Sequence, residues 1–565
     1  MLALSASEMK KFSGNVNNLI QPLLTDKYQV SMCYAYWRDQ KHNVKAVFDL
    51  YFRKNPFKGE YTIFAGLSEC LKYIENFHFT ANDIDYLKSI PDYSKIENEF
   101  WVYLENLNSK SIKLFALHEG SVCFPNLPLV KVEGPLGMLQ LIETALLNLI
   151  NYASLVATNA ARYKIAAQAG SMPNCKLLEF GLRRAQGPDG GFSASRYSYI
   201  GGFDATSNLL AGKEFGIPVS GTLSHAFVMA YFGSPKLSID DKSEHKYLLN
   251  KSTGKEEDFT ERCLIVEDDL IKKNLRKHYS ENSSTNERSE LKAFIAFASA
   301  FPETFLALVD TYDVIRSGLI NFCIVAIALL QFNYKPIGIR IDSGDLAYLS
   351  KYAKDLFIAV SRAYYLDEFV DFEIVASNDI NEETINSLND QKHAITSLGI
   401  GTHLVTCQSQ PALGCVYKLV EADGIPCMKL SSMPEKTTIP CKKSAYRLFG
   451  RDETALLDLI ILDSEPMPLP GQRILCRHPF VPEKRCYATP ARVEPLLNLW
   501  WDGQSCQDLP NLSKIRNHCT NSLSYLTDDI KRSLNPTPYK VSVSEKLYNL
   551  INQLKLDLTP IGELA

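Results

Sequence analysis

The chain has 565 residues, of which 46% are hydrophobic and 22% are charged, and its formal net charge at pH 7 is −4. A chain of this length is too long for a single hydrophobic core, so two or three domains are expected, and the composition is that of a soluble globular enzyme. The slight negative charge, with no basic arm and no block of like charge, argues against a broad nucleic-acid-binding surface.

The sequence also favours a cytosolic location. The first residues lack the basic start and apolar core of a signal peptide. The most apolar stretch, 319–332, contains Asn321 and is too short to span a bilayer, so a buried helix is expected there. The 14 cysteines form no Cys-x-x-Cys pair and show no zinc-type spacing with histidine, so we expect them to be reduced, buried thiols.

The N-terminal part has mixed helix and strand patterns. Residues 1–17 are small and polar and are expected to form a flexible terminus. Residues 18–150 are expected to form an α+β domain. Thr25 is predicted to cap a helix over 26–37. The other segments are predicted strands at 44–52, 61–64, 113–117 and 129–132, and predicted helices at 67–77, 81–89 and 97–106.

Two further helices, 136–150 and 155–169, lead into a repeated pattern in which a short apolar strand ends in a polar residue and is followed by a helix, such as the one expected at 204–215. The strands of this pattern are 177–180, 217–220, 305–309, 337–341, 372–376 and 398–400. The pattern predicts a parallel (β/α) barrel over residues 151–415, with an open doubly wound sheet as the alternative.

Residues 234–290 interrupt the pattern with dense charge and a run of Asn, Ser and Thr. This composition predicts a solvated, partly disordered insertion without a chemical role. Residues 416–565 are expected to pack back on the N-terminal domain. Their predicted strands are 416–420, 428–430, 446–448 and 456–461, and their predicted helices are 493–499, 521–526 and 544–554.

The ends of the predicted strands carry residues suited to phosphate binding. Arginine pairs can grip phosphate oxygens in a bidentate manner, and small residues at a helix start let backbone amides approach a phosphate. The candidates are Arg183, Arg184, Asn378, Gly399, Gly401 and Thr402. A structural ion pair for the arginines and ordinary turns for the glycines are the alternatives.

A second group of polar residues follows the same strands: Thr222, His225, Asp310, Arg340, Asp342 and Asp345. Arg340 stands within an apolar strand, which is costly without an anionic partner. Asp342 and Asp345 flank Ser343 and Gly344, so they could hold Mg²⁺ or bind ribose hydroxyls. Either carboxylate could instead cap a helix.

Five segments that contain these residues resemble the nicotinate phosphoribosyltransferase family. They are LLTDKYQ at 23–29, EFGLRRAQGPDGG at 179–191, SGTLSH at 220–225, IRIDSGDL at 339–346 and GIGT at 399–402. The similarity extends from about Leu23 to the C-terminal helix, and the motifs are long and in the family's order. The charged insertion is the main departure.

The resemblance implies an irregular (β/α) barrel of the type II phosphoribosyltransferase kind, with an α+β sandwich domain built from the N-terminal and C-terminal segments. It implies transfer of phosphoribosyl from phosphoribosyl pyrophosphate to nicotinate, with ATP as co-substrate and Mg²⁺ or Mn²⁺ as cofactor. The products would be nicotinate mononucleotide, ADP, phosphate and pyrophosphate, in the first step of NAD biosynthesis from nicotinic acid. A homodimer is also implied.

The resemblance further implies roles for individual residues. His225 matches the histidine that ATP phosphorylates, a role that suits a neutral imidazole. Asp310 and Asp342 would act on ribose or metal, the latter with Asp345 as a second metal ligand. The nicotinate-binding residues would be Tyr28, contributed by the partner subunit, Thr222 and Arg340. The phosphoribosyl pyrophosphate-binding residues would be Arg183, Arg184, Asn378, Gly399, Gly401 and Thr402.

Three other functions compete with this interpretation. Transfer to nicotinamide would use the same fold, but a neutral amide gains little from Arg340. A barrel aldolase or isomerase of sugar phosphates would need a lysine or a carboxylate base, and no lysine occupies the predicted strand ends. The third alternative is a catalytically silent binding protein.

Overall fold

In the computed structural model, the described residues are 17–170, 173–233, 240, 245–275, 285–431, 436–559 and 561. They belong to two compact units. Unit 1 comprises Met1–Ala161, Arg196–Gly202 and Cys407–Ala565, and unit 2 comprises Arg162–Ser195 and Phe203–Thr406. The expected flexible terminus, 1–17, lies outside the described residues except for Asn17.

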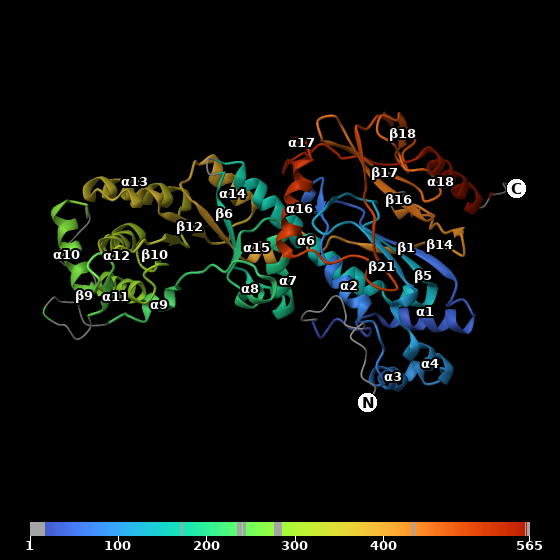
Figure 1. Ribbon diagram of the computed structural model, residues 1–565, viewed down its shortest axis with the longest axis horizontal. Coiled ribbons are helices and arrows are strands. Elements are labelled where there is room, and N and C mark those ends of the chain that lie inside the picture. The colour runs from blue at the N-terminus through green and yellow to red at the C-terminus, as the bar shows by residue number, and fades with distance from the viewer. Residues whose placement is uncertain are drawn as a thin grey trace. The chain divides into compact units, whose positions relative to one another are not determined.

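Unit 1 contains two six-stranded sheets (Figure 1). The first has the order β15-β14-β1-β5-β3-β21, and β1 pairs antiparallel with both β5 and β14, so N-terminal and C-terminal segments share one sheet. The bounds are β1 Lys45–Tyr51, β3 Lys113–Ala116, β5 Val130–Pro135, β14 Val416–Ala422, β15 Ile425–Pro426 and β21 Asn498–Asp502.

The second sheet of unit 1 is built from C-terminal segments alone, in the order β19-β18-β22-β17-β16-β20. Its strands are β16 Lys443–Phe449, β17 Ala455–Leu462, β18 Ile474–Arg477, β19 Arg485–Ala488, β20 Arg492–Pro495 and β22 Val541–Val543. A small sheet pairs β2 Thr62–Ile63 with β4 Val122–Cys123.

The helices of this part of the chain follow most of the predicted segments. They are α1 Lys27–Arg38, α2 Leu67–Glu75, α3 Ala81–Ser89, α4 Asn98–Asn106, α5 Leu136–Leu141, α6 Glu143–Gln168, which belongs to unit 2 from Arg162 onward, α16 Leu512–Ser524, α17 Asp528–Lys531 and α18 Glu545–Leu558, with short 3₁₀ helices η2 Pro56–Lys58, η3 Pro91–Tyr93 and η4 Ser109–Ser111. Thr80 caps α3. Asp26, not Thr25, caps α1, because Asp26 and Gln29 form a reciprocal capping box.

Three predictions in these segments are wrong. The stretch 136–169 forms α5 and one long α6 rather than two helices of similar length. Residues 493–499 belong to β20 and β21 rather than a helix, because Pro495 cannot donate the hydrogen bond that a helix interior needs. Residues 428–430 form no strand, since the Lys429 amide donates to the Thr438 hydroxyl (3.0 Å) instead of a neighbouring strand.

Unit 2 is organised around a six-stranded sheet of order β10-β11-β12-β13-β6-β7, in which every adjacent pair is parallel. The strands are β6 Lys176–Glu179, β7 Ala205–Thr206, β10 Leu306–Leu308, β11 Gly338–Ile341, β12 Glu373–Ser377 and β13 Ser397–Ile400. The segment 217–220 joins the sheet through a single parallel bridge between Thr206 and Val219. Within the described residues no backbone ladder joins this segment to β10, so the sheet is a parallel half-barrel.

The helices of unit 2 follow the strands. They are α7 Gly187–Ile200, whose last turn belongs to unit 1, α8 Leu209–Phe215, α9 His225–Met229, α10 Phe259–Lys272, α11 Thr285–Ala300, α12 Leu319–Gln331, α13 Leu346–Tyr364, α14 Glu382–Asp390, α15 Thr402–Val405, and the short η5 Leu182–Arg184, η7 Val314–Gly318 and η8 Asp367–Asp371. The helix expected at 204–215 begins only at Leu209, because Asn208 caps it and accepts from the Ala211 amide.

The apolar helix α12 lies in the core of unit 2, as the sequence predicts. Val314–Gln331 is the one helical stretch of the described residues that is long and apolar enough to cross a membrane, and 78% of it is buried inside the protein. Helices α10 and α11 pack against α12 (Figure 1). This stretch is therefore a core helix.

The charged insertion is more regular than predicted. Within 245–275, the longest described stretch of the insertion, the hairpin strands β8 Tyr247–Asn250 and β9 Lys255–Asp258 are followed by α10. Phe259, Cys263 and Leu270 of α10 are buried. The dense charge of the other face obscured this amphipathic helix in the sequence.

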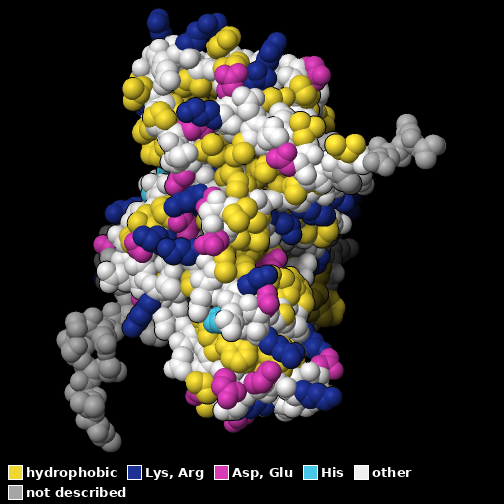
Figure 2. Space-filling model, turned by 90° about the vertical axis from the view of Figure 1, so that its right-hand side faces the viewer, with side chains coloured by type: hydrophobic (Ala, Val, Ile, Leu, Met, Phe, Trp, Pro, Cys, Tyr) yellow, Lys and Arg dark blue, Asp and Glu magenta, His cyan; other side chains and the backbone are white. Residues whose placement is uncertain are grey.

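Acidic and basic side chains are interspersed on the face of the molecule that Figure 2 shows, with hydrophobic side chains between them. This mixture reflects the near balance of 60 Lys and Arg residues against 64 Asp and Glu residues in the sequence.

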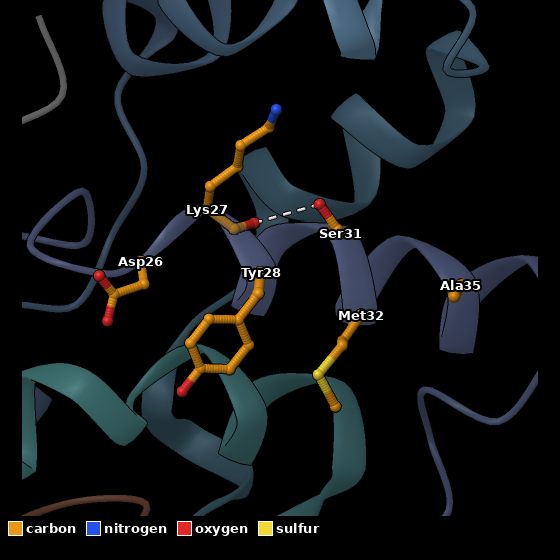
Figure 3. Close-up of a pocket in the computed structure, with 6 residues that line it drawn as sticks. All are labelled: Asp26, Lys27, Tyr28, Ser31, Met32 and Ala35. Carbon is orange, nitrogen blue, oxygen red and sulfur yellow. Dashed lines mark hydrogen bonds between the residues drawn. The ribbon is translucent and has the colours of Figure 1, made fainter.

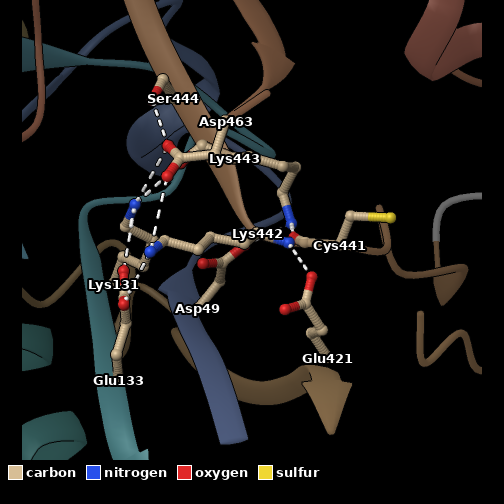
Figure 4. Close-up of polar contacts among 9 residues, drawn as sticks. All are labelled: Asp49, Lys131, Glu133, Glu421, Cys441, Lys442, Lys443, Ser444 and Asp463. Atoms are coloured by element: carbon tan, nitrogen blue, oxygen red, sulfur yellow. Dashed lines mark hydrogen bonds and ion pairs between the residues drawn. The ribbon is translucent and has the colours of Figure 1, made fainter. Parts of the chain in front are cut away.

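A buried ionic cluster joins the two large sheets of unit 1 (Figure 4). Lys443 of β16 lies 2.7 Å from the Asp49 carboxylate of β1, and the two side chains are 1% and 3% exposed. The Lys443 ammonium group also donates to the carbonyls of Ile439 (2.8 Å) and Cys441 (2.7 Å). Lys131 of β5 donates to the Lys443 carbonyl (3.1 Å). The pairing of buried charges therefore fixes the position of one sheet on the other.

We predict that Asp49→Ala lowers the free energy of unfolding by about 3–5 kcal/mol, because it leaves the buried Lys443 ammonium group without its counter-ion. Chemical denaturation measures the change. The control is Asp502→Ala, which removes the exposed partner of Lys113 (44% and 51% exposed) and should cost less than about 1 kcal/mol. Equal losses in the two variants would contradict the role of the buried pair.

Candidate functional site

The carboxyl edge of the parallel sheet holds a guanidinium group inside a hydrogen-bonded cluster. Arg340 of β11 donates from Nε to the Ser377 hydroxyl (2.8 Å) and from Nη2 to Asp342 Oδ1 (2.9 Å). The Ser377 hydroxyl itself donates to Asp342 Oδ1 (2.5 Å). The Arg340 side chain is only 13% exposed, and its guanidinium lies 5.4 Å from the Phe180 ring centroid. Arg340 is thus held rigidly at the end of its strand.

Asp342 is held in its ionised form by these contacts. Burial alone would raise the pKa of its carboxyl group, but the Ser377 hydroxyl and the Arg340 guanidinium outweigh burial and hold that pKa below its usual range. Asp342 is therefore a permanent carboxylate at neutral pH.

A second carboxylate, Asp310, lies beside the first. Asp310 Oδ2 accepts from the Asp342 amide (3.2 Å) and from the Ser343 hydroxyl (2.5 Å). Its side chain is 2% exposed, and within the described residues its other oxygen, Oδ1, has no hydrogen-bond partner. A buried carboxylate oxygen of this kind is suited to a cation or a hydroxyl group of a ligand.

His225 faces both carboxylates. It is the first residue of α9, and its Nε2 lies 3.7 Å from Asp342 Oδ2 and 4.0 Å from Asp310 Oδ1. Its Nδ1 lies 3.1 Å from the Thr311 hydroxyl, which holds the plane of the ring. The side chain is 39% exposed, so the imidazole is open to a ligand.

Thr222 lies three residues before His225, and its hydroxyl donates to the backbone carbonyl of Leu306 in β10 (2.6 Å). This bond ties the loop after 217–220 to the strand that precedes Asp310. Thr222 and His225 are thereby fixed at the same edge as Asp310.

The residues predicted to bind phosphate form a neighbouring group. Arg184 of η5 donates from Nη1 to the Thr402 hydroxyl at the start of α15 (3.4 Å), and the side chains of Arg183 and Arg184 are exposed. Gly181 lies so close to α15 that a Cβ there would be 2.2 Å from Val405. The sequence needs glycine here because the two turns touch.

Gly399 and Asn378 show two different backbone constraints. A Cβ at Gly399 would lie 2.6 Å from the Phe180 ring, so glycine allows the ring to pack against β13 and beside Arg340. Phe180 thus lies between the residues predicted to bind phosphate and the Arg340 cluster. Asn378, directly after β12, has φ +112° and Asp379 has φ +44°, a backbone that residues with side chains seldom adopt.

Asp345 caps α13, because its Oδ1 accepts from the Tyr348 amide (2.9 Å). A role as a metal ligand stays a prediction for this residue. The described residues contain no group of three His, Cys, Asp or Glu side chains arranged to hold a metal ion. Asp310 and Asp342 are the pair of carboxylates that could share a cation with ligand phosphates.

Tyr28 lies in unit 1, on α1, whereas the other predicted site residues lie in unit 2. It is 48% exposed and lines an open pocket of about 790 Å³ formed along one helix face. Figure 3 shows the Tyr28 ring and the Met32 side chain projecting from the same side of α1. The remaining lining residues are Asp26, Lys27, Ser31 and Ala35.

The sequence pattern predicts no site role for Thr311 or Ser343. The available signal was position, because each hydroxyl residue lies at or just after the end of a parallel strand or next to a predicted carboxylate. Their hydrogen-bond partners come from other strands, which the sequence order does not reveal.

Comparison with known proteins agrees with this geometry. The chain matches the nicotinate phosphoribosyltransferase (NAPRTase) N-terminal domain over residues 23–151 and the C-terminal domain of the same family over residues 442–551. It is 52% identical to nicotinate phosphoribosyltransferase of Caenorhabditis elegans, over 97% of this chain and 96% of that one. It is 51% identical to nicotinate phosphoribosyltransferase 2 of Arabidopsis thaliana, over 98% of each chain.

Its structure is similar to the crystal structure of human nicotinic acid phosphoribosyltransferase, with a TM-score of 0.81 and 39% sequence identity, over 94% of this chain and 99% of that chain. The structural likeness therefore covers both units and confirms the mixed α/β fold. The chain belongs to the nicotinate phosphoribosyltransferase family.

Proposed function

We propose that this enzyme transfers the phosphoribosyl group of phosphoribosyl pyrophosphate to nicotinate, with ATP as co-substrate, and so forms nicotinate mononucleotide for NAD biosynthesis in the cytosol. The observation that carries the proposal is the cluster at the carboxyl edge of the parallel sheet, where one arginine, two carboxylates and a histidine lie within reach of one another. An anionic acceptor, a ribose and phosphate groups can be bound together there.

Arg340 is the residue we assign to the nicotinate carboxylate. Within the described residues no hydrogen bond reaches its Nη1 group, whereas Nε and Nη2 are occupied by Ser377 and Asp342. A fixed guanidinium with one unused donor group favours an acid over a neutral amide. Thr222, on the loop before α9, would complete this end of the site.

His225 is the residue we assign to phosphoryl transfer from ATP. A partly exposed imidazole at a helix N-terminus can approach a phosphate, and the Thr311 hydroxyl keeps the ring in one plane. Breakdown of the phosphohistidine in each cycle would then drive the transfer. Arg183 and Arg184, with the turns at Asn378, Gly399 and Gly401 and the Thr402 hydroxyl, would hold the phosphates of the sugar.

Mg²⁺ or Mn²⁺ fits the same edge. The buried Asp310 Oδ1 atom lacks a hydrogen-bond partner among the described residues, and Asp342 is kept ionised. Magnesium is commonly held by one or two carboxylates and the phosphates of its substrate. When bound, the ion would offset the negative charge of the departing pyrophosphate.

The complete barrel is also part of the proposal. The segment 217–220 bonds to β7, and the Thr222 hydroxyl reaches the Leu306 carbonyl of β10 at the opposite edge of the sheet. We infer that this side-chain bond closes the ring of strands where backbone pairing is missing, with Arg340, His225 and Thr402 around one mouth.

A homodimer with shared sites would explain the surface of α1. Tyr28 and Met32 are exposed apolar side chains beside an open pocket, and exposed aromatic rings of this kind are typical of interfaces. We propose that Tyr28 stacks on the pyridine ring in the site of the partner subunit.

For His225→Ala we expect loss of the stimulation by ATP with retention of some ATP-independent transfer, because the imidazole that accepts the phosphoryl group is removed while the residues assigned to the sugar and to nicotinate stay. The assay follows nicotinate mononucleotide with and without ATP. His78→Ala, at an exposed histidine of unit 1, is the control. Equal loss of both activities in His225→Ala would reject the assignment.

For Arg340→Gln we expect the KM for nicotinate to rise about a hundredfold, since a charge-assisted contact of about 3 kcal/mol is lost. Discrimination against nicotinamide should fall in parallel. Competition between the two substrates measures it, with the exposed Arg362→Gln as the control. Unchanged preference for the acid would mean that another residue binds the carboxylate.

If each active site of the homodimer contains Tyr28 from one subunit and His225 from the other, two inactive variants should complement each other. When Tyr28→Ala and His225→Ala chains are co-expressed, half of the dimers are mixed and each mixed dimer keeps one intact site, so about a quarter of the ATP-stimulated activity should return. Each variant alone should lack that activity. Failure of the mixture to regain it would show that each subunit uses its own Tyr28.

A further inference from the structure

The turn that follows β12 is held in an unfavourable backbone conformation. Asn378 (φ +112°) and Asp379 (φ +44°) are consecutive residues with side chains in the left-handed region. Their side chains are exposed, so their own contacts do not stabilise the turn. Such a turn persists only when the structure on both sides of it is fixed. On one side the fixed residue is Ser377, which is buried and bonded to Arg340 and Asp342.

On the other side Ile380 is buried, Asn381 caps α14 by accepting from the Thr384 amide (2.8 Å), and Glu382 is the first residue of the helix. Arg162 of α6 binds the Glu382 carboxylate with two hydrogen bonds, from Nε to Oε2 (2.8 Å) and from Nη2 to Oε1 (3.1 Å). The Arg162 and Glu382 side chains are 5% and 18% exposed. A bidentate pair fixes orientation as well as distance, so it holds the first turn of α14 against α6.

The rest of α14 has its own attachment to α6. Asn389, in the last turn of α14, donates to the Ala166 carbonyl (2.8 Å). This second bond already docks the helix, and a buried ion pair contributes little net stability compared with apolar packing. The position of the Arg162–Glu382 pair, three residues after Asp379, therefore points to control of the turn as well as to stability.

We propose that Arg162 is a positioning residue for phosphate binding: through Glu382 it holds the first turn of α14, and with it the Asn378 turn, to which the proposed function assigns a phosphate group of phosphoribosyl pyrophosphate. The inference deepens the proposed function and depends on it. Arg162 itself contacts no substrate in this proposal. It acts only by holding one end of the strained turn while Ser377 holds the other.

The test is Arg162→Lys, which keeps the charge and loses the forked geometry. We expect the KM for phosphoribosyl pyrophosphate to rise about tenfold, while kcat and the KM for nicotinate change less than about twofold. Asn389→Ala is the matched control, because it loosens the same helix at its other end. It should lower the melting temperature and leave the KM for phosphoribosyl pyrophosphate unchanged.

Two further variants keep the proposal testable if Arg162→Lys does not fold. Glu382→Gln should raise the same KM, and the exchanged pair Arg162→Glu with Glu382→Arg should recover part of the loss. A lower melting temperature with an unchanged KM in Arg162→Lys and Glu382→Gln would overturn the positioning role. A wild-type enzyme that forms no nicotinate mononucleotide would instead reject the proposed function.

Discussion

The chemistry proposed for the carboxyl edge of the parallel sheet in unit 2 depends on a positive charge within that sheet. Arg340 belongs to β11, which has a strand on each side, and such a charge is tolerated only when anionic and polar groups surround it. Asp342 and Ser377 provide that compensation and bond to each other as well as to the guanidinium. The guanidinium and the Ser377 hydroxyl therefore hold the pKa of Asp342 below its usual range, and this carboxylate lies beside His225.

The two units contribute different kinds of residues to the proposed function. In unit 2 the strands bring residues from distant positions in the chain to one edge, which parallel pairing makes possible. In unit 1 the interior contains buried ion pairs such as Lys443 with Asp49, and its α1 presents Tyr28 at the surface. The charged residues that we assign to substrate all come from unit 2. Tyr28, which we assign to the site of the partner subunit, belongs to unit 1.

The sequence predicts the parallel strands well, because short apolar runs followed by polar residues are a local signal. All six predicted strands of the pattern take part in the sheet, although 217–220 does so through one bridge. The strand β7 was not predicted, because the two residues Ala205–Thr206 are too few to show a hydrophobic pattern. The family resemblance is confirmed by the comparisons, whereas the roles of single residues remain predictions.

Features that depend on contacts between distant segments could not be predicted from sequence. Examples are the hydroxyl of Thr222 on the Leu306 carbonyl, the Thr311 contact with His225, and the pair formed by Arg162 and Glu382. The charged face of α10 masks its buried residues in the sequence pattern, and Pro495 disfavours the helix predicted at 493–499. The local sequence pattern predicts single strands and helices, but it does not predict contacts between two elements that are distant in the chain.

The first sheet of unit 1 has a consequence for synthesis of the protein. Strand β1 bonds along one side to β14, with Ala46 opposite Ala422. A ribosome adding about 5–20 residues per second needs on the order of a minute to make the segment between them. Until then the nascent β1 presents one unpaired edge, which is a template for association with other chains. Chaperone binding to the emerging N-terminal region would protect this edge during translation.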